Sequence, residues 1–188
     1  MASRTYGVPG LSEGDSAKVA GLLQDRLHAL NDLHLTLKHI HWNVVGPHFI
    51  AVHLMLDPQV DTVREYADQV AERIATLGGS PKGTPGALVA ERSWNEYSLG
   101  RAGVIEHLGA LDLVYAGVIE SHRSAIEEVG EIDPITEDLL IAQSGQLEQY
   151  QWFVRAHLEN SAGALSTAGA TTEREAADQA EAGASKSV

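Results

Sequence analysis

Residues 33–57 are LHLTLKHIHWNVVGPHFIAVHLMLD, and they join two long stretches that have the hydrophobic rhythm of helices. In the first, predicted over residues 12–45, an apolar residue recurs every three or four positions, which places these residues on one buried face. They are Val19, Leu22, Leu23, Leu27, Leu30, Leu33, Leu37, Ile40 and Val44. Gly46-Pro47 breaks this helix, because proline cannot continue it. The second helix is predicted over residues 50–77, and Pro58 inside it should cost one backbone hydrogen bond.

The rest of the chain adds two more long helices. Residues 78–97 are rich in glycine and proline and form a long connection, with a short helix predicted near residues 87–92. Further helices are predicted over residues 99–129 and 134–159. Four long helices with one long crossover predict an all-α fold, a ferritin-like four-helix bundle whose crossover between the second and third helices carries a short helix. An unrelated α-helical bundle is the alternative.

Composition divides the chain into three parts and limits its chemistry. We expect residues 1–11 to be a flexible segment, residues 12–160 to be the bundle, and the Ala/Gly/Ser-rich residues 161–188 to be a disordered tail. The chain has no cysteine, so any metal ligands must be nitrogen or oxygen. A formal net charge of −13 argues against broad attraction to nucleic acid or to anionic membranes. No secretory signal or membrane span is recognisable, so we expect a cytoplasmic protein.

Four side chains of metal-ligand type share one face of the predicted second helix. His53 and Asp57 are four residues apart, as are Asp68 and Glu72. At about 100° per residue, the four lie at roughly 0°, 40°, 60° and 100° around the helix axis. His41, at the end of the first helix, can approach His53 and Asp57 across the Gly46-Pro47 turn. These five residues are the candidate metal ligands and catalytic residues. A solvated polar face is the alternative reading of such a stripe.

The stripe is too long for one metal site within one chain. Asp57 and Asp68 are separated by about 16 Å along the helix, whereas metal–ligand bonds are about 2 Å long. An antiparallel, twofold-related copy of the helix would place Asp68 and Glu72 of one chain beside His41, His53 and Asp57 of the other. The chain has no Glu-x-x-His motif, which a site within a single bundle would need. Ligands of this type suit Fe(II), Mn(II) or Zn(II).

The segment HIHWNVVGPHF (residues 39–49), followed by His53, Asp57 and DQVAER (residues 68–73), resembles the Dps family of miniferritins, the DNA-protection-during-starvation group. The motif covers about residues 31–78, and its NDLHLTLKH portion (residues 31–39) is similar to actinobacterial members. The predicted helices agree with this family from about residue 12 to residue 159.

The resemblance implies a hollow homo-dodecamer, built from twofold dimers, with ferroxidase centres at the twofold interfaces. It implies that each centre holds iron (Fe²⁺/Fe³⁺) at two metal positions, that Fe(II) is oxidised preferably by hydrogen peroxide, and that ferric mineral is stored inside. Such a protein would act as an iron store that protects the cell against oxidative stress. The implied iron ligands are His41, His53, Asp57, Asp68 and Glu72.

Three further residues receive roles by the same resemblance. Trp42, beside His41, is interpreted as a sink for stray oxidising equivalents, with interface packing as the alternative. Asp133 and Asp138 lie in an acidic cluster between the last two helices and are candidates for an iron entry pore. An ordinary acidic helix end is the alternative for this cluster.

The tail departs from the lysine-rich tails by which many family members bind DNA. Residues 161–188 contain four acidic and two basic residues, so their net charge is −2. We therefore expect weak or absent DNA binding at physiological salt, although twelve-fold repetition could leave the protein associated with the nucleoid. A DNA-binding protein of the nucleoid and a di-metal hydrolase remain the alternative functions.

Overall fold

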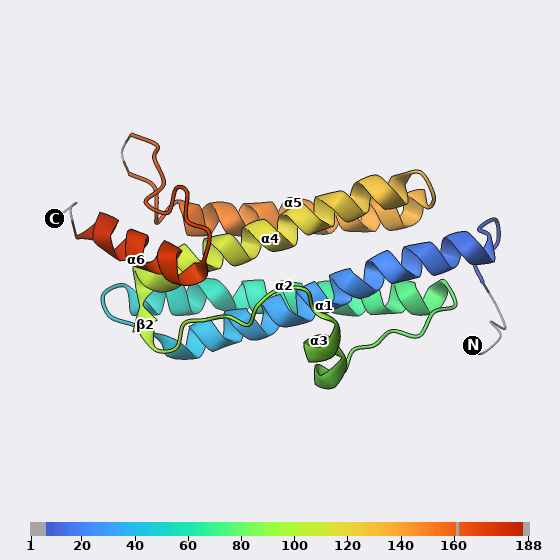
Figure 1. The fold of residues 1–188 in the computed structure, drawn as a ribbon, viewed down its shortest axis with the longest axis horizontal. Coiled ribbons are helices and arrows are strands. Elements are labelled where there is room, and N and C mark those ends of the chain that lie inside the picture. Colours follow the sequence, from blue (N-terminus) through green and yellow to red (C-terminus); the bar gives the residue numbers. More distant parts are fainter. Residues whose placement is uncertain (1–6, 161, 186–188) are drawn as a thin grey trace.

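The computed structural model describes residues 7–160 and 162–185. Its helices in this part of the chain are α1 (Glu13–Asn43), α2 (Phe49–Thr76), α3 (Pro85–Glu91), α4 (Val104–Gly130), α5 (Pro134–Arg155) and α6 (Glu173–Ala184). Figure 1 shows α1 beside α2 and α4 beside α5, with the crossover and its short helix α3 running along the bundle. The predicted all-α, ferritin-like four-helix bundle with a crossover helix is therefore confirmed. Within the described residues, no helix has both the length and the apolar character needed to cross a membrane.

The start and the buried face of α1 follow from its sequence. Ser12 caps the helix, because its side-chain oxygen accepts a hydrogen bond from the backbone N–H of Asp15 at 3.1 Å. The apolar stripe then packs into the core, where Leu23, Leu30 and Leu37 are completely buried. Truncating one such leucine to alanine costs about 2–5 kcal/mol, so this stripe is a main source of the bundle's stability.

A short two-stranded parallel sheet lies at the end of α1 and was not predicted. The strands β1 (Val44–Val45) and β2 (Ala102–Gly103) pair with Val44 opposite Ala102. This pairing ties the turn between α1 and α2 to the start of α4. The turn itself uses left-handed backbone at Gly46, where φ is 96°. It returns the chain along α1, so the end of α1 and the beginning of α2 lie side by side.

Helix α2 continues unbroken through Pro58. The side chain of this proline is exposed, so its ring does not disturb the core. The backbone hydrogen bond that this proline cannot donate is therefore missing on the exposed side of the helix. The helix ends at Thr76, and the two glycines that follow close it: Gly78 adopts φ 79°, and the Gly79 N–H donates to the Ile74 carbonyl at 2.9 Å.

The prediction of disorder for residues 161–188 is wrong for most of this segment. Helix α6 lies against α4, and Ala176, Ala177 and Ala180 are at most 1% exposed. The contact is close, since a Cβ on Gly109 of α4 would lie 2.7 Å from the Ala176 carbonyl oxygen. Alanine is both the best helix former and small enough for this packing. The alanine-rich composition that suggested disorder therefore allows a helix to pack closely against α4. Residues 161 and 186–188 lie outside the described residues.

The N-terminal segment is described only in part. Residues 1–6 of the predicted flexible segment 1–11 lie outside the described residues. Beyond them, Val8 and Leu11 are partly buried against the main core, and the Leu11 N–H donates to the Val8 carbonyl at 3.2 Å. Residues 8–11 therefore form an ordered turn that packs on the bundle ahead of α1.

Candidate metal centre

Three of the five predicted ligands meet at one end of the α1–α2 pair. His41 is in the last turn of α1, and His53 and Asp57 follow in the first half of α2. Nε2 of His41 lies 2.9 Å from Oδ1 of Asp57. The imidazole rings of His41 and His53 stack with their centroids 3.6 Å apart. The turn at Gly46 thus brings together side chains that are up to sixteen positions apart in the sequence.

Both imidazoles are arranged as metal ligands need to be. Nδ1 of His53 lies 2.9 Å from the carbonyl oxygen of His41; a carbonyl only accepts, so Nδ1 donates the proton and Nε2 keeps a free lone pair. His41 is 9% exposed, and neither of its ring nitrogens has a well-aligned hydrogen-bond partner in the described part of the chain. Burial lowers the pKa of His41, although Asp57 opposes this shift. A neutral, buried imidazole whose only close polar contact is a poorly aligned one with Asp57 fits a metal ligand.

Lys38 belongs to this site and was missed from the sequence. Its Nζ lies 3.3 Å from Oδ1 of Asp57 and 5.9 Å from the centre of the Trp42 ring. Desolvation raises the pKa of Asp57, but the hydrogen bond from Lys38 and the nearby His41 together outweigh it and lower the pKa overall. The lysine is one helical turn before His41, and this spacing was the only available signal. Asp57 is therefore an anion that a cation already contacts.

Asp68 and Glu72 lie apart from these three residues. Both are exposed and belong to the C-terminal half of α2. No group of three or more His, Asp or Glu side chains within the described residues of one chain is placed to hold a metal ion. Asp68 instead lines an open groove of about 710 Å³ together with Asp61 and Arg64. One chain thus presents two separated sets of ligand-type side chains: His41 of α1 with His53 and Asp57 of α2, and Asp68 with Glu72 farther along α2.

The surface around the His41 end is unusually apolar. Trp42 is 71% exposed, and Leu35 lies two turns before it on α1. On α2, Ile50 and Leu54 are each 58% exposed, and the ring of Phe49 lies 5.0 Å from that of His53. Large apolar side chains exposed together mark a contact surface rather than a solvated face.

The two candidate pore residues differ from one another. Asp133 is 6% exposed and caps α5; its carboxylate accepts hydrogen bonds from Arg73 at 2.6 Å and from the Thr136 hydroxyl at 2.5 Å. Its charge is thereby neutralised within its own chain, which leaves it a structural role. Asp138 is exposed on α5. The pore remains a prediction, and of the two residues only Asp138 has a free carboxylate at the surface among the described contacts.

Comparison with known proteins agrees with this architecture. A family model described as a ferritin-like domain matches residues 20–163. The chain is 60% identical over 176 residues to the DNA protection during starvation protein of Mycolicibacterium smegmatis, covering 94% of this chain and 96% of that protein. It is also 56% identical over 156 residues to the fine tangled pili major subunit of Haemophilus ducreyi, covering 83% and 82%.

Solved structures show the same relationship. DpsA14 from Streptomyces coelicolor is 68% identical, with a TM-score of 0.86 over 87% of this chain and 97% of that one. Mycobacterium smegmatis Dps in its tetragonal form is 61% identical, with a TM-score of 0.85 over 88% and 99%. The sequence and the backbone fold of this chain match those of its relatives over most of the length of each protein. The chain belongs to the Dps family of ferritin-like proteins.

Proposed function

We propose that this protein is a ferroxidase and iron store that oxidises Fe(II), preferably with hydrogen peroxide, in the cytoplasm. Iron is its substrate and cargo, held at two metal positions in each of two identical centres per twofold dimer. Six such dimers would form the hollow dodecamer that stores ferric mineral. The observation that carries this proposal is the cluster of His41, His53 and Asp57. Asp68 and Glu72 lie apart from it, farther along α2.

Each centre would combine the two separated sets. His41, His53 and Asp57 of one chain would face Asp68 and Glu72 of the partner subunit, as an antiparallel crossing of two α2 helices requires. The exposed apolar side chains around Trp42 support this contact, because they would be buried by a second copy. The free Nε2 of His53 and the anionic Asp57 would bind Fe(II), and Lys38 would have to withdraw from Asp57.

The chemistry balances without a resident cofactor. Two Fe(II) ions give up one electron each, and one hydrogen peroxide molecule is reduced to the oxidation level of water. Hydrolysis of the Fe(III) to oxyhydroxide then releases four protons for each pair of iron ions. The carboxylates of Asp57, Asp68 and Glu72 would stabilise the higher charge of Fe(III). Consuming Fe(II) and peroxide together removes both reagents of hydroxyl-radical formation, which would protect DNA and other targets.

The test is anaerobic loading with Fe(II), followed by hydrogen peroxide or dioxygen, with ferric absorbance as the readout. We expect faster oxidation with peroxide, and loss of the fast phase in Asp57→Ala. The matched control is Glu120→Ala, which removes an exposed carboxylate from α4, away from the ligand stripe of α2. Equal rates for wild type and Asp57→Ala would contradict the proposed site.

We further propose that this protein protects DNA chemically and binds it weakly or not at all. The relatives named as DNA protection during starvation proteins do not specify how protection occurs. In this chain α6 carries Glu173, Glu175, Asp178 and Glu181 against Arg174 alone, and the net charge of the chain is −13. Such a surface has few cations to exchange for the counterions of DNA. A gel shift by the assembled protein at low nanomolar concentration in physiological salt would contradict this.

A further inference from the structure

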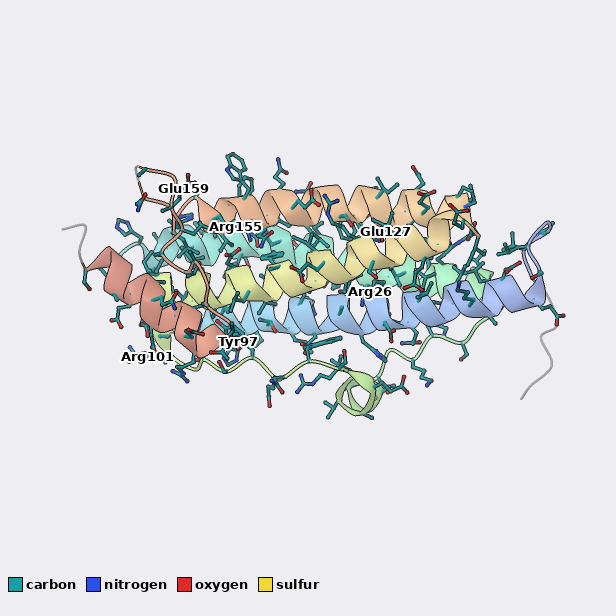
Figure 2. All side chains as sticks on the ribbon, turned by 45° about the horizontal axis from the view of Figure 1, so that its top comes forward. Arg26, Tyr97, Arg101, Glu127, Arg155 and Glu159 are labelled. Atoms are coloured by element: carbon teal, nitrogen blue, oxygen red, sulfur yellow. The ribbon has the colours of Figure 1, made fainter. Side chains whose placement is uncertain are left out.

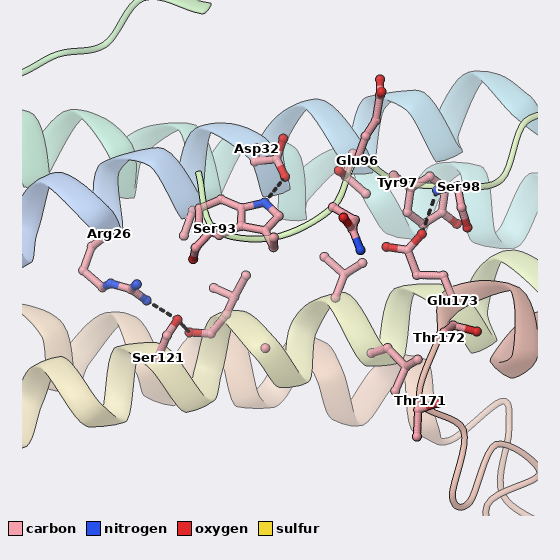
Figure 3. A pocket seen from close by; sticks show the side chains of 18 residues that line it. Arg26, Asp32, Ser93, Glu96, Tyr97, Ser98, Ser121, Thr171, Thr172 and Glu173 are labelled. Atoms are coloured by element: carbon pink, nitrogen blue, oxygen red, sulfur yellow. Dashed lines mark hydrogen bonds between the residues drawn. The ribbon is translucent and has the colours of Figure 1, made fainter. Parts of the chain in front are cut away.

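A cleft of about 500 Å³ lies on the side of the bundle formed by α1, α4 and the crossover (Figure 3). Its walls are the facing sides of α1 and α4, crossover residues 93–98, and residues 171–173 just before and at the start of α6. None of the proposed iron ligands lines it. The volume is within the range of small-molecule sites, which is about 300–1,000 Å³. The cleft is therefore a separate feature that iron chemistry does not use.

The charged group at one end of the cleft is Arg26, whose burial is unusual. It is 7% exposed, and its guanidinium donates to the Ser121 hydroxyl across the space between α1 and α4. Among the described residues it has no other hydrogen bond and no carboxylate in ion-pair contact; the charge of Asp25 acts on it only from a distance, and burial outweighs that charge and lowers the pKa of Arg26. Burial, together with the charge of Arg26, lowers the pKa of His122 to about 4, so that histidine adds no second charge. An arginine stays charged in proteins, and a buried charge without a counterion is costly.

The carboxylates of the cleft are already engaged or lie in solvent. Asp32 accepts the indole N–H of Trp94 at 2.5 Å. Glu173 accepts the backbone N–H of Ser98 at 2.7 Å, which also fixes the crossover to the start of α6. Glu96 is exposed. The unsatisfied group inside the cleft is thus a cation, and the ligand that complements it is an anion.

Apolar residues form part of the cleft lining, alongside its serine, threonine and asparagine side chains. Its floor includes the small residues Ala29 and Gly117, with Val114 and Val118 beside them, and Trp94 contributes an aromatic wall. A Cβ built on Gly117 meets nothing within 4 Å, so the space above the floor is open. An open space between apolar residues and an indole suits an aromatic ring.

We propose that this cleft binds a small planar aromatic carboxylate, with its carboxylate on Arg26 and its ring between Trp94 and the floor at Gly117. The guanidinium N–H groups not used by Ser121 form the fork that holds a carboxylate through two parallel hydrogen bonds. Such binding would neutralise Arg26 and fill the open volume.

Isothermal titration of the assembled full-length protein with 1-naphthoate tests this, with the uncharged 1-naphthamide as its isostere. We expect one naphthoate per chain and roughly tenfold to hundredfold weaker binding of the amide, because hydrogen bonds to a charged partner contribute that much. Arg26→Gln retains a donor for Ser121 and should reduce naphthoate affinity to that of the amide. Gly117→Leu fills the floor and should abolish the binding of both compounds.

Arg101→Gln is the matched control, since Arg101 is exposed and lies near α6, away from Arg26 (Figure 2). It should leave naphthoate affinity unchanged. In a Trp42→Phe/Trp152→Phe background Trp94 is the only tryptophan, and naphthoate should change its fluorescence with the same affinity. Equal affinity for acid and amide, unaltered binding by Arg26→Gln, or no saturable binding up to about 10 mM would each overturn the proposal.

Discussion

Two inactive variants of this protein should restore activity when they assemble together. In Asp57→Ala the set of ligands formed by His41, His53 and Asp57 is incomplete, and in Glu72→Ala the set formed by Asp68 and Glu72 is incomplete. Each variant alone has two damaged centres per twofold dimer. In a mixed dimer one centre combines both damaged sets, while the other combines two intact ones. Random pairing at equal amounts makes half of the dimers mixed, so about one quarter of all centres should be intact.

The assay is co-expression of the two chains, purification of the assembly, and the initial rate of ferric absorbance after peroxide is added to anaerobic Fe(II)-loaded protein. We expect about one quarter of the wild-type rate. Both substitutions replace at least partly exposed side chains on a helix with alanine, so folding should change by only a few tenths of a kcal/mol. Asp57→Ala paired with His41→Ala damages the same set twice and should give no rescue. A mixture that stays at the rate of the single variants would refute the shared centre.

Three further substitutions test other parts of the structure. Lys38→Met frees Asp57 and should strengthen Fe(II) binding up to roughly fivefold in anaerobic titrations. Gly109→Val forces a side chain against α6 and should lower stability by about 1–3 kcal/mol, with faster hydrogen exchange in residues 173–184. Asp133→Asn leaves the partly buried Arg73 without its counterion and should cost about 1–3 kcal/mol in denaturant unfolding at neutral pH.

The Asp133 effect also has a defined pH dependence. Desolvation opposes the shift, but the Thr136 hydroxyl and Arg73 lower the pKa of this carboxyl below its unfolded value of about 3.9. Its stabilisation is therefore complete above that value and is lost as the pH falls through the folded pKa. The difference in the free energy of unfolding between wild type and Asp133→Asn should be constant from pH 5 to 7 and should decrease in stronger acid. A difference unchanged at pH 2 would contradict this assignment.

Matched control substitutions distinguish these specific effects from a general loss of stability. Lys18→Met removes an exposed lysine near the opposite end of α1 and should leave Fe(II) affinity unchanged. Gly21→Val introduces the same side chain where a Cβ meets nothing within 4 Å, and should not alter exchange in α6. Weaker Fe(II) binding by Lys38→Met, or unaltered exchange in Gly109→Val, would count against the corresponding interpretation.

The parts of the fold that sequence predicts are those with long periodic signals. The apolar stripe from Val19 to Val44 and the break at Gly46-Pro47 were sufficient for the helical hairpin that places His41 beside His53. The strands β1 and β2 have two residues each, too few for any periodicity. Helix α6 was missed because its small residues are buried against distant residues such as Leu99, Gly109 and Ala110, contacts that no local sequence pattern indicates. Lys38 was missed for a similar reason, since its contact with Asp57 joins two helices.

The hydrogen bond between Ser98 and Glu173 has a consequence for how the protein is made. It joins residues that are 75 positions apart, and Arg174 adds a second link to the Ser98 carbonyl at 3.1 Å. A ribosome delivers the chain from its N-terminus at about 5–20 residues per second, so α1, α2 and α4 emerge seconds before α6 exists. Before α6 exists, the crossover is therefore held only by its contacts with the bundle, such as the Trp94–Asp32 hydrogen bond, and the cleft lacks the wall formed by residues 171–173. Both are completed when α6 docks, which makes this corner a late part of the subunit to mature.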